Sequence, residues 1–267
     1  DAISFVDYVP ESTNALASVA TNLSRVSQDF LLWSTFEIGF LELSEEMSGV
    51  SSIMPQKKNP YVLEKTRSVA NDVIGAANSS IASLDAVPYG DVSENMYAAL
   101  PFFRNVDRTV RAIRLFAAIV EDVELHEEQM YRDAVESFCT MTELSDTLVR
   151  TRGLSFRQAH EVVGRLTHNV YNDGRHAGEI TVADLDRAGE EMIGETDLLG
   201  REELDSALDP RQNVMRRDIA GGTAPEQNEA DLTAQRDHLE TQRAWLEKTR
   251  SRLADAREQR RNPDLSA

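Results

Sequence analysis

A short stretch of the sequence, residues 51–60, places several groups that bind anions or move protons side by side. It reads SSIMPQKKNP and so holds two hydroxyls, two ammonium groups and two carboxamides. Pro60 stands where a long helical pattern begins, and the backbone N–H groups at a helix start are unpaired and attract negative charge. The sequence therefore predicts an anion site at residues 51–60, with the two serines at its edge.

The chemistry of this stretch suits an acidic substrate whose negative charge grows during the reaction. A proton removed beside a carboxylate leaves a doubly charged aci-carboxylate, which Lys57 and Asn59 could stabilise by positive charge and hydrogen bonding. A serine can serve as the base only if N–H groups and lysines stabilise its alkoxide. A purely structural loop has little need for Gln, two Lys and Asn in succession. We therefore interpret residues 51–60 as a functional loop.

The composition argues against several classes of partner. The chain has 267 residues, of which 41% are hydrophobic and 28% are charged, as expected of a globular protein. Its net charge of −18 argues against a nucleic-acid partner, because binding the phosphate backbone requires basic surface. No run approaches the roughly 18 apolar residues of a membrane span. We expect no nucleic acid and no membrane as partners, and a cytoplasmic location.

Other motifs of catalytic sites are absent from the sequence. Cys139 is the only cysteine, so no internal disulfide and no thiolate cluster can form, and we expect a small buried residue. The segment from His160 to Gly164 begins like a zinc-protease motif but has glycine where the second histidine is required. No glycine-rich nucleotide loop and no G-x-S-x-G motif is present. The residues thus offer no metal, nucleotide or hydrolase site.

Helical periodicity organises the chain around the loop. Long helices are expected over residues 12–32, 60–83 and 93–121, and shorter ones over 134–150, 155–171, 181–192 and 202–208. In the third long helix we expect these apolar residues to be buried: Leu100, Val106, Val110, Ile113, Leu115 and Phe116. Gly153 predicts a helix C-terminal cap, Ser155 with Gln158 has the form of a capping box, and Thr181 caps the next helix.

A last helix, over residues 226–260, carries a leucine at every seventh position. Arginines occupy the positions where a coiled coil needs apolar residues, so we interpret it as a helix that packs one leucine stripe. The elements together predict an all-α fold, with a long-helix bundle followed by a smaller C-terminal helical domain. We assign residues 1–125, including the loop 48–60, to the bundle, 126–225 to the small domain and 226–267 to a charged helix and tail.

With Gly49 before it, the stretch 51–60 closely resembles the signature loop of the fumarase/aspartase superfamily, and its Gln-Lys-Lys variant resembles argininosuccinate lyase in particular. Residues 1–4, 33–43 and 153–164 agree with that family, and the segment 209–225 resembles its C-terminal end. The resemblance covers nearly the whole chain but only the later part of a family member. The chain also begins at Asp1 in mid-pattern, so we expect an N-terminal part to precede it.

The resemblance implies a homotetramer with active sites shared among subunits. It also implies elimination of fumarate from an N-succinyl compound, a dicarboxylate substrate, without metal or organic cofactor. Ser51 matches the family's catalytic base, and Lys57 matches the position that holds the charged intermediate. The resemblance implies further substrate-binding positions at Ser52, Met54, Asn59 and Tyr89.

Departures from the family's pattern leave the amine half of the substrate open. Val50 replaces a glycine before the first serine, and Val6 replaces an arginine. The run 89–96, YGDVSENM, lacks the Gln and Lys that help to hold the arginine part of the substrate. The family's proton-donating histidine lies in an N-terminal part that this sequence does not include. Two alternatives therefore stay open: the same elimination on another N-succinyl amino acid or diamine, or a non-catalytic assembly protein with this fold.

Overall fold

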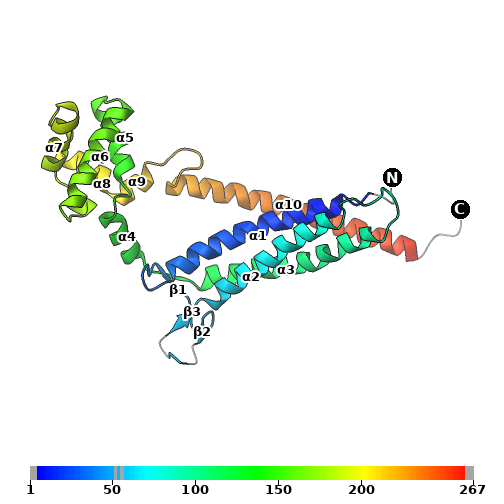
Figure 1. Cartoon of the computed structure of the whole chain (residues 1–267). Helices are drawn as coiled ribbons and strands as arrows, with labels where there is room; N and C mark the ends of the chain where they lie inside the picture. Colours follow the sequence, from blue (N-terminus) through cyan, green and yellow to red (C-terminus); the bar gives the residue numbers. More distant parts are fainter. Residues whose placement is uncertain (1–4, 51–52, 55–56, 262–267) are drawn as a thin grey trace. The chain divides into compact units, whose positions relative to one another are not determined.

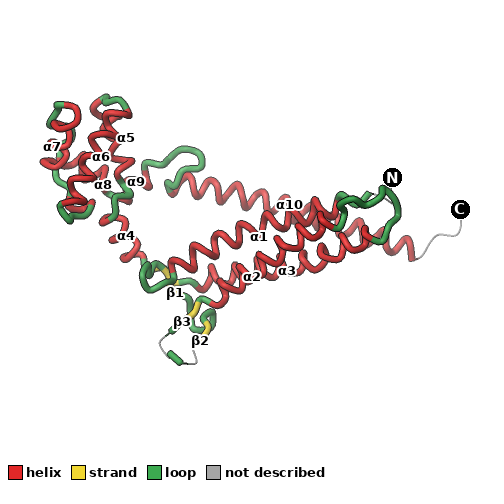
Figure 2. Tube along the Cα trace, viewed as in Figure 1, coloured by secondary structure: helices red, strands yellow, loops and turns green. Residues whose placement is uncertain are grey.

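The computed structural model describes residues 5–50, 53–54 and 57–261, and nearly all of their regular structure is helical (Figures 1 and 2). The all-α prediction is confirmed. The chain divides into two compact units, Asp1–Met130 and Tyr131–Ala267. No helix among the described residues is long and apolar enough to cross a membrane.

The first unit is a bundle of three long helices, α1 (Tyr8–Trp33), α2 (Tyr61–Ala82) and α3 (Glu94–Asp122) (Figure 1). At about 1.5 Å per residue they are about 39, 33 and 44 Å long. Helix α1 begins four residues before the expected start at Ser12, because Pro10 falls in the first turn, where a helix needs no N–H donor. Small residues such as Ala20 and Ala70 are buried between α1 and α2, so the two backbones approach closely.

The burial expected within α3 is largely wrong. Leu100, Val106, Val110 and Ile113 are exposed, whereas the buried residues of this helix are Ala98, Asn105, Thr109, Ala112 and Ile119. Small side chains let the helices approach closely, and two polar side chains bond to the backbone of the neighbouring helix. Asn105 Nδ2 donates to the Val73 carbonyl of α2 at 3.4 Å, and Ser80 Oγ donates to the Ala98 carbonyl at 3.1 Å. Leu115 and Phe116 pack against the cluster of the buried Ile119, whereas several other large apolar side chains of α3 form an outward face.

One end of the bundle carries four two-residue strands in two antiparallel pairs. Strand β1 (Leu41–Glu42) pairs with β4 (Glu124–Leu125), with Glu42 opposite Glu124. Strand β2 (Gly49–Val50) pairs with β3 (Lys58–Asn59), with Gly49 opposite Asn59. Below them Leu43, Leu63 and Ile119 are buried in one cluster, which anchors this end of the bundle. We call the β2–β3 pair the loop neck.

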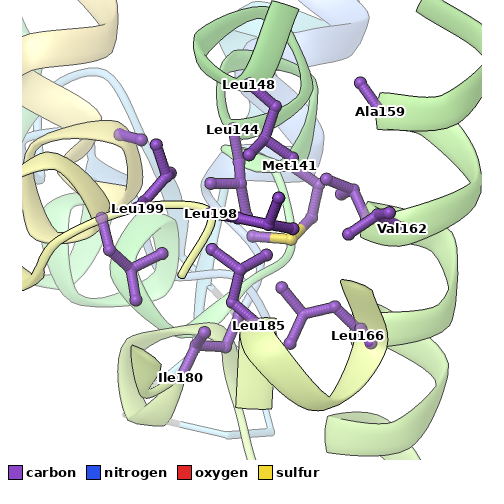
Figure 3. Packing of buried hydrophobic residues seen from close by; sticks show 14 of the residues in the cluster. Met141, Leu144, Leu148, Ala159, Val162, Leu166, Ile180, Leu185, Leu198 and Leu199 are labelled. Atoms are coloured by element: carbon purple, nitrogen blue, oxygen red, sulfur yellow. The ribbon is translucent and has the colours of Figure 1, made fainter. Parts of the chain in front are cut away.

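The second unit packs short helices around one apolar core (Figure 3). Its elements are α5 (Met141–Arg152), α6 (Phe156–Asn172), the 3-10 helix η1 (Ala177–Glu179), α7 (Val182–Ile193), α8 (Arg201–Leu208) and α9 (Pro210–Met215). The predicted caps are confirmed: Gly153 has a φ of +67°, and Ser155 and Thr181 each accept a backbone N–H in a capping box.

The single helix expected over residues 134–150 is wrong. Helix α4 (Glu127–Glu136), which begins in the first unit, ends before α5 starts at Met141. Cys139 lies in the break between them and is exposed, where we expected a buried residue. Its thiol donates to the Ala134 carbonyl at 3.3 Å, so it closes the turn after α4 rather than filling a core position.

The last helix, α10 (Pro225–Arg261), has no buried residue among those described, so the leucine stripe expected to pack is exposed. Its leucines at positions 232, 239, 246 and 253 are between 39% and 53% exposed. Ion pairs within the helix, Arg243 with Glu240 and Arg250 with Glu247, support it from its own surface.

The second unit also contains a buried carboxylate bound by three arginines. Glu143 in α5 is 2% exposed and pairs with Arg150, about two turns further along the same helix. Arg216 Nη1 lies 3.0 Å from Glu143 Oε1 and Arg217 Nη2 lies 3.6 Å from Oε2. Because these two arginines follow α9, the carboxylate ties the end of the short-helix unit back to its first core helix.

We predict that Glu143→Gln lowers the free energy of unfolding of the second unit. A broken buried pair costs about 3–5 kcal/mol, and since these arginines partly reach water we expect about 2–3 kcal/mol. Urea titration followed by circular dichroism measures the loss. Glu161→Gln, an exposed position on α6, is the matched control and should change stability by less than about 0.5 kcal/mol. Equal stability of the two variants would contradict the role of Glu143.

Candidate active site

The loop neck holds the two ends of the predicted functional loop together. Asn59 is half-buried, and its Nδ2 donates to the Gly49 carbonyl across the neck at 3.4 Å. A Cβ added to Gly49 would lie 3.3 Å from the Cβ of Tyr61, tighter than nearly all real contacts. Glycine at this position therefore lets the strand approach the first turn of α2.

The predicted site residues of the loop fall partly inside the described chain. Ser51 and Ser52 lie outside the described residues. Met54 and Lys57 are exposed, and the Lys57 backbone N–H donates to the Met54 carbonyl at 3.1 Å. With Asn59 in the neck, three of the predicted residues thus lie within a few residues of the start of α2.

The start of α2 leaves its positive end without a side-chain cap. Pro60 occupies the N-cap position, one residue before the expected place of that proline in the helix, and its side chain can accept no hydrogen bond. The partial positive charge of a helix N-terminus and its free N–H groups favour an anion nearby. The local backbone therefore agrees with the predicted anion site.

The two consecutive lysines have different environments. The Lys58 ammonium pairs with the Glu42 carboxylate of β1, with side-chain exposures of 46% and 48%. Lys57 is exposed, and no ion pair of its ammonium is found within the part of the chain that the structure describes. Glu42 thus neutralises one lysine, and the other keeps a positive charge that an anionic ligand can meet.

Glu42 and His126 were not predicted from the sequence. The hydrogen bond from Lys58 is the largest effect on the pKa of Glu42 and lowers it. Burial raises this pKa by less than the hydrogen bond lowers it, and the charges of Lys58 and His126 each lower it by a still smaller amount. His126 Nε2 lies 4.0 Å from Glu42 Oε2, and Nδ1 donates to the Gly39 carbonyl at 2.8 Å. The only sequence signal for Glu42 is its place between two leucines, since the contact to Lys58 spans 16 residues.

Tyr89 does not lie near the loop within one chain. It is 78% exposed in the connection between α2 and α3, beyond the C-terminal end of α2. The loop neck precedes the other end of this 22-residue helix, which is about 33 Å long. Figure 1 shows the β2–β3 pair and the α2–α3 connection at opposite ends of the bundle. One chain therefore does not bring Tyr89 and Lys57 into one pocket.

Comparisons with known proteins agree with this arrangement of a loop, a bundle and a short-helix unit. A lyase family model matches residues 1–75, and a model described as argininosuccinate lyase C-terminal matches residues 138–215. The argininosuccinate lyase of Methanothermobacter thermautotrophicus is 35% identical over 243 residues, which are 91% of this chain and 52% of that protein. The chain belongs to the argininosuccinate lyase family of the fumarase/aspartase superfamily.

Further relatives extend this likeness to solved structures. The argininosuccinate lyase of Methanoculleus marisnigri is 35% identical over 259 residues, which are 96% of this chain and 51% of that protein. An EDDS lyase variant with bound fumarate is 32% identical with a TM-score of 0.88, over 96% of this chain and 51% of that one. A class II fumarase from Schistosoma mansoni, at 22% identity and a TM-score of 0.59 over 76% of this chain and 39% of its own, shares the fold. The chain spans about half the length of the curated family members that it matches.

We predict that Lys58→Met raises the pKa of Glu42 toward its ordinary value of 4.5, because the hydrogen bond from Lys58 is the largest cause of the lowering. A carboxylate with a lowered pKa contributes stability above its ordinary pKa and loses it as the pH falls through its folded value. Carbon-13 NMR of the glutamate side-chain carboxyls measures the pKa. Lys65→Met, on the exposed side of α2, should leave it unchanged, and an unchanged value in Lys58→Met would contradict the assignment.

Proposed function

We propose that the protein is a C–N lyase that eliminates fumarate from argininosuccinate or a related N-succinyl amine. The observation that carries the proposal is the uncapped start of α2 near Lys57, whose ammonium makes no ion pair within the described part of the chain, in a member of the argininosuccinate lyase family. A site of this kind stabilises an anion. The two serines of the loop precede it in the sequence. The likeness to an EDDS lyase with bound fumarate supports fumarate as one product.

In the proposed mechanism Ser51 is the base. Its alkoxide takes a proton from the succinyl carbon next to a carboxylate, and the electron pair moves onto that carboxylate as an aci-carboxylate. The charge then returns to form the carbon–carbon double bond while the C–N bond breaks, which leaves fumarate and an amine that takes up a proton. No net oxidation occurs, so the reaction needs no redox cofactor.

The remaining loop residues have distinct roles in this proposal. Lys57 supplies positive charge where the dianion forms, an effect that counts most for charge that develops in the transition state. Asn59 and Met54 line the substrate from the loop neck and the loop itself, with Ser52 beside the base. Lys58 is a poor candidate for stabilising the dianion, because its ammonium already forms an ion pair with the Glu42 carboxylate.

We also propose that the protein acts in the cytoplasm as a homotetramer with active sites shared among subunits. Tyr89 can join Lys57 only if the two come from different copies, because α2 separates them within one chain. Helix α3 offers a surface for such contacts, and it exposes the following apolar residues: Leu100, Phe103, Val106, Val110, Ile113 and Val120. Apolar faces of this extent on a single chain mark association sites.

The amine half of the substrate is the open part of the proposal. The run 89–96 lacks the family's expected Gln and Lys, and a relative of equal coverage is named EDDS lyase rather than argininosuccinate lyase. These observations favour a second candidate, the same elimination on another N-succinyl amino acid or diamine.

A panel of N-succinyl amines separates the two candidate substrates, because strong preference for argininosuccinate rules the second out. No fumarate from any substrate, with a stable tetramer, would support a non-catalytic assembly protein.

We predict that Ser51→Ala lowers kcat for fumarate release by about 10²–10⁴-fold, the contribution of a general base. The assay follows the ultraviolet absorbance of fumarate with the intact protein and argininosuccinate. Ser68→Ala is the matched control, since Ser68 is exposed on α2 and donates only to the Glu64 carbonyl one turn earlier. Full activity in Ser51→Ala would remove Ser51 from the mechanism.

We predict that Val110→Asp on α3 dissociates the oligomer, because it places a charge in the proposed apolar interface. Light scattering coupled to size-exclusion chromatography gives the mass, and circular dichroism checks the fold. Val110 is exposed in the single chain, so the helix itself should tolerate aspartate. Val214→Asp, at an equally exposed valine in α9, is the control and should keep the parent mass. An unchanged mass for Val110→Asp would refute this interface.

A further inference from the structure

The backbone at Glu42 is fixed by its two buried neighbours in the chain and by the pairing of its strand. Leu41 and Leu43, its neighbours in the chain, are buried and anchor the segment to the end of the bundle. Strand β1 pairs with β4, and the His126 backbone N–H extends this pairing by donating to the Phe40 carbonyl at 2.9 Å. The carboxylate thus starts from a fixed backbone although the side chain itself is half exposed.

The ion pair of Glu42 joins this fixed segment to the loop neck. Its partner Lys58 belongs to β3, directly opposite Val50 in β2. Within the described parts of the chain, this is the one ion pair made by any residue of the neck. His126 Nε2 faces the other carboxylate oxygen at 4.0 Å, so the carboxylate has a neighbour on each side.

The other lysine of the loop, Lys57, stands next to the neck. Lys57 directly precedes β3, and its ammonium makes no ion pair within the described residues. Glu42 could pair with either of the two consecutive lysines, and pairing with Lys57 would place its negative charge on the cation of the predicted anion site. The observed pairing with Lys58 therefore links Glu42 to strand β3 of the neck and does not involve the ammonium of Lys57.

We propose that Glu42 is a positioning residue for the elimination: by holding Lys58 it fixes the loop neck and leaves the Lys57 ammonium to the substrate carboxylate. The inference rests on the proposed function for its effect on catalysis, but the fixing of the neck is a property of the protein alone. Exposed ion pairs stabilise a fold weakly, so the expected effect is a shift in the population of the binding-competent neck. Such a shift raises the apparent dissociation constant and leaves the bound complex unchanged.

The kinetic test compares Glu42→Gln with Glu45→Gln in the intact protein. Both remove one negative charge near Lys58, but Glu45 acts on it only through space and forms no hydrogen bond with it. Loss of a nearby negative charge alone would lower KM for an anionic substrate. We expect KM to rise about three- to fivefold in Glu42→Gln with kcat within about twofold, as a smaller competent fraction requires. In Glu45→Gln we expect KM to stay unchanged or to fall.

A charge swap and a measurement without substrate complete the test. The double variant Glu42→Lys with Lys58→Glu restores the pair in reverse and should recover most of the KM, whereas either single reversal should not. Hydrogen exchange at residues 49–50 and 58–59 should be faster in Glu42→Gln, normal in Glu45→Gln and restored in the swap. Circular dichroism confirms that each variant is folded.

The two readouts separate failure of this inference from failure of the proposed function. An unchanged or lower KM in Glu42→Gln, with unchanged exchange in the neck, overturns the role of Glu42 and leaves the lyase proposal intact. A wild-type protein that releases no fumarate from any N-succinyl amine overturns the function. In that case faster exchange in Glu42→Gln, restored by the swap, still supports the fixing of the neck, and unchanged exchange overturns it.

Discussion

The length of α2 is the constraint on which the arrangement of the candidate site depends. The helix is continuous for 22 residues and contains no proline or break. Alanines and serines in it pack closely against α1 and α3, so its two ends are held at a fixed separation. The predicted anion site lies before its first turn, and Tyr89 lies beyond its last. A site that uses both ends has to be assembled from more than one chain.

The same constraint gives a reason for the outward apolar face of α3. Along much of α3, small and polar residues are buried, and several larger aliphatic and aromatic residues are exposed. This is the reverse of what a self-sufficient bundle needs, because the largest side chains release the most free energy when they are buried. The reversal is what the proposed assembly requires, because another copy would then cover the outward face of α3. In that proposal one sequence pattern serves both assembly and completion of the site.

The sequence was informative wherever a structure is determined by neighbouring residues. Gly153, Ser155 and Thr181 act within one helical turn, so their caps could be predicted. The helices over residues 60–83 and 93–121 were placed within one residue or so at each end, because their periodic patterns are long. The family could be recognised because the residues of the loop are consecutive in the sequence.

The misses depend on contacts that local sequence does not specify. Periodicity marks the apolar face of α3 but cannot say whether the same chain or another copy covers it. The break at Cys139 and the burial of Glu143 depend on how separate helices meet. Glu42 contacts Lys58 only because β1 and β3 are brought to one end of the bundle, and a lone glutamate between leucines gives no sign of that contact. A residue proposed to orient the site, such as Glu42, was therefore harder to find than the consecutive residues of the loop.

The separation along α2 also bears on how specificity can change in this family. In the proposed assembly the two halves of the substrate are recognised at opposite ends of the same helix, and so by different copies at any one site. The loop and its neck hold the succinyl half, whose chemistry is the same for every substrate of this class. The run 89–96 faces the amine half and makes no contribution to the neck, since about 33 Å of helix lies between them. In this proposal, substitutions after Tyr89 exchange one amine for another without disturbing the pair of Glu42 with Lys58. This sequence combines that pair with a run 89–96 that departs from the family's pattern.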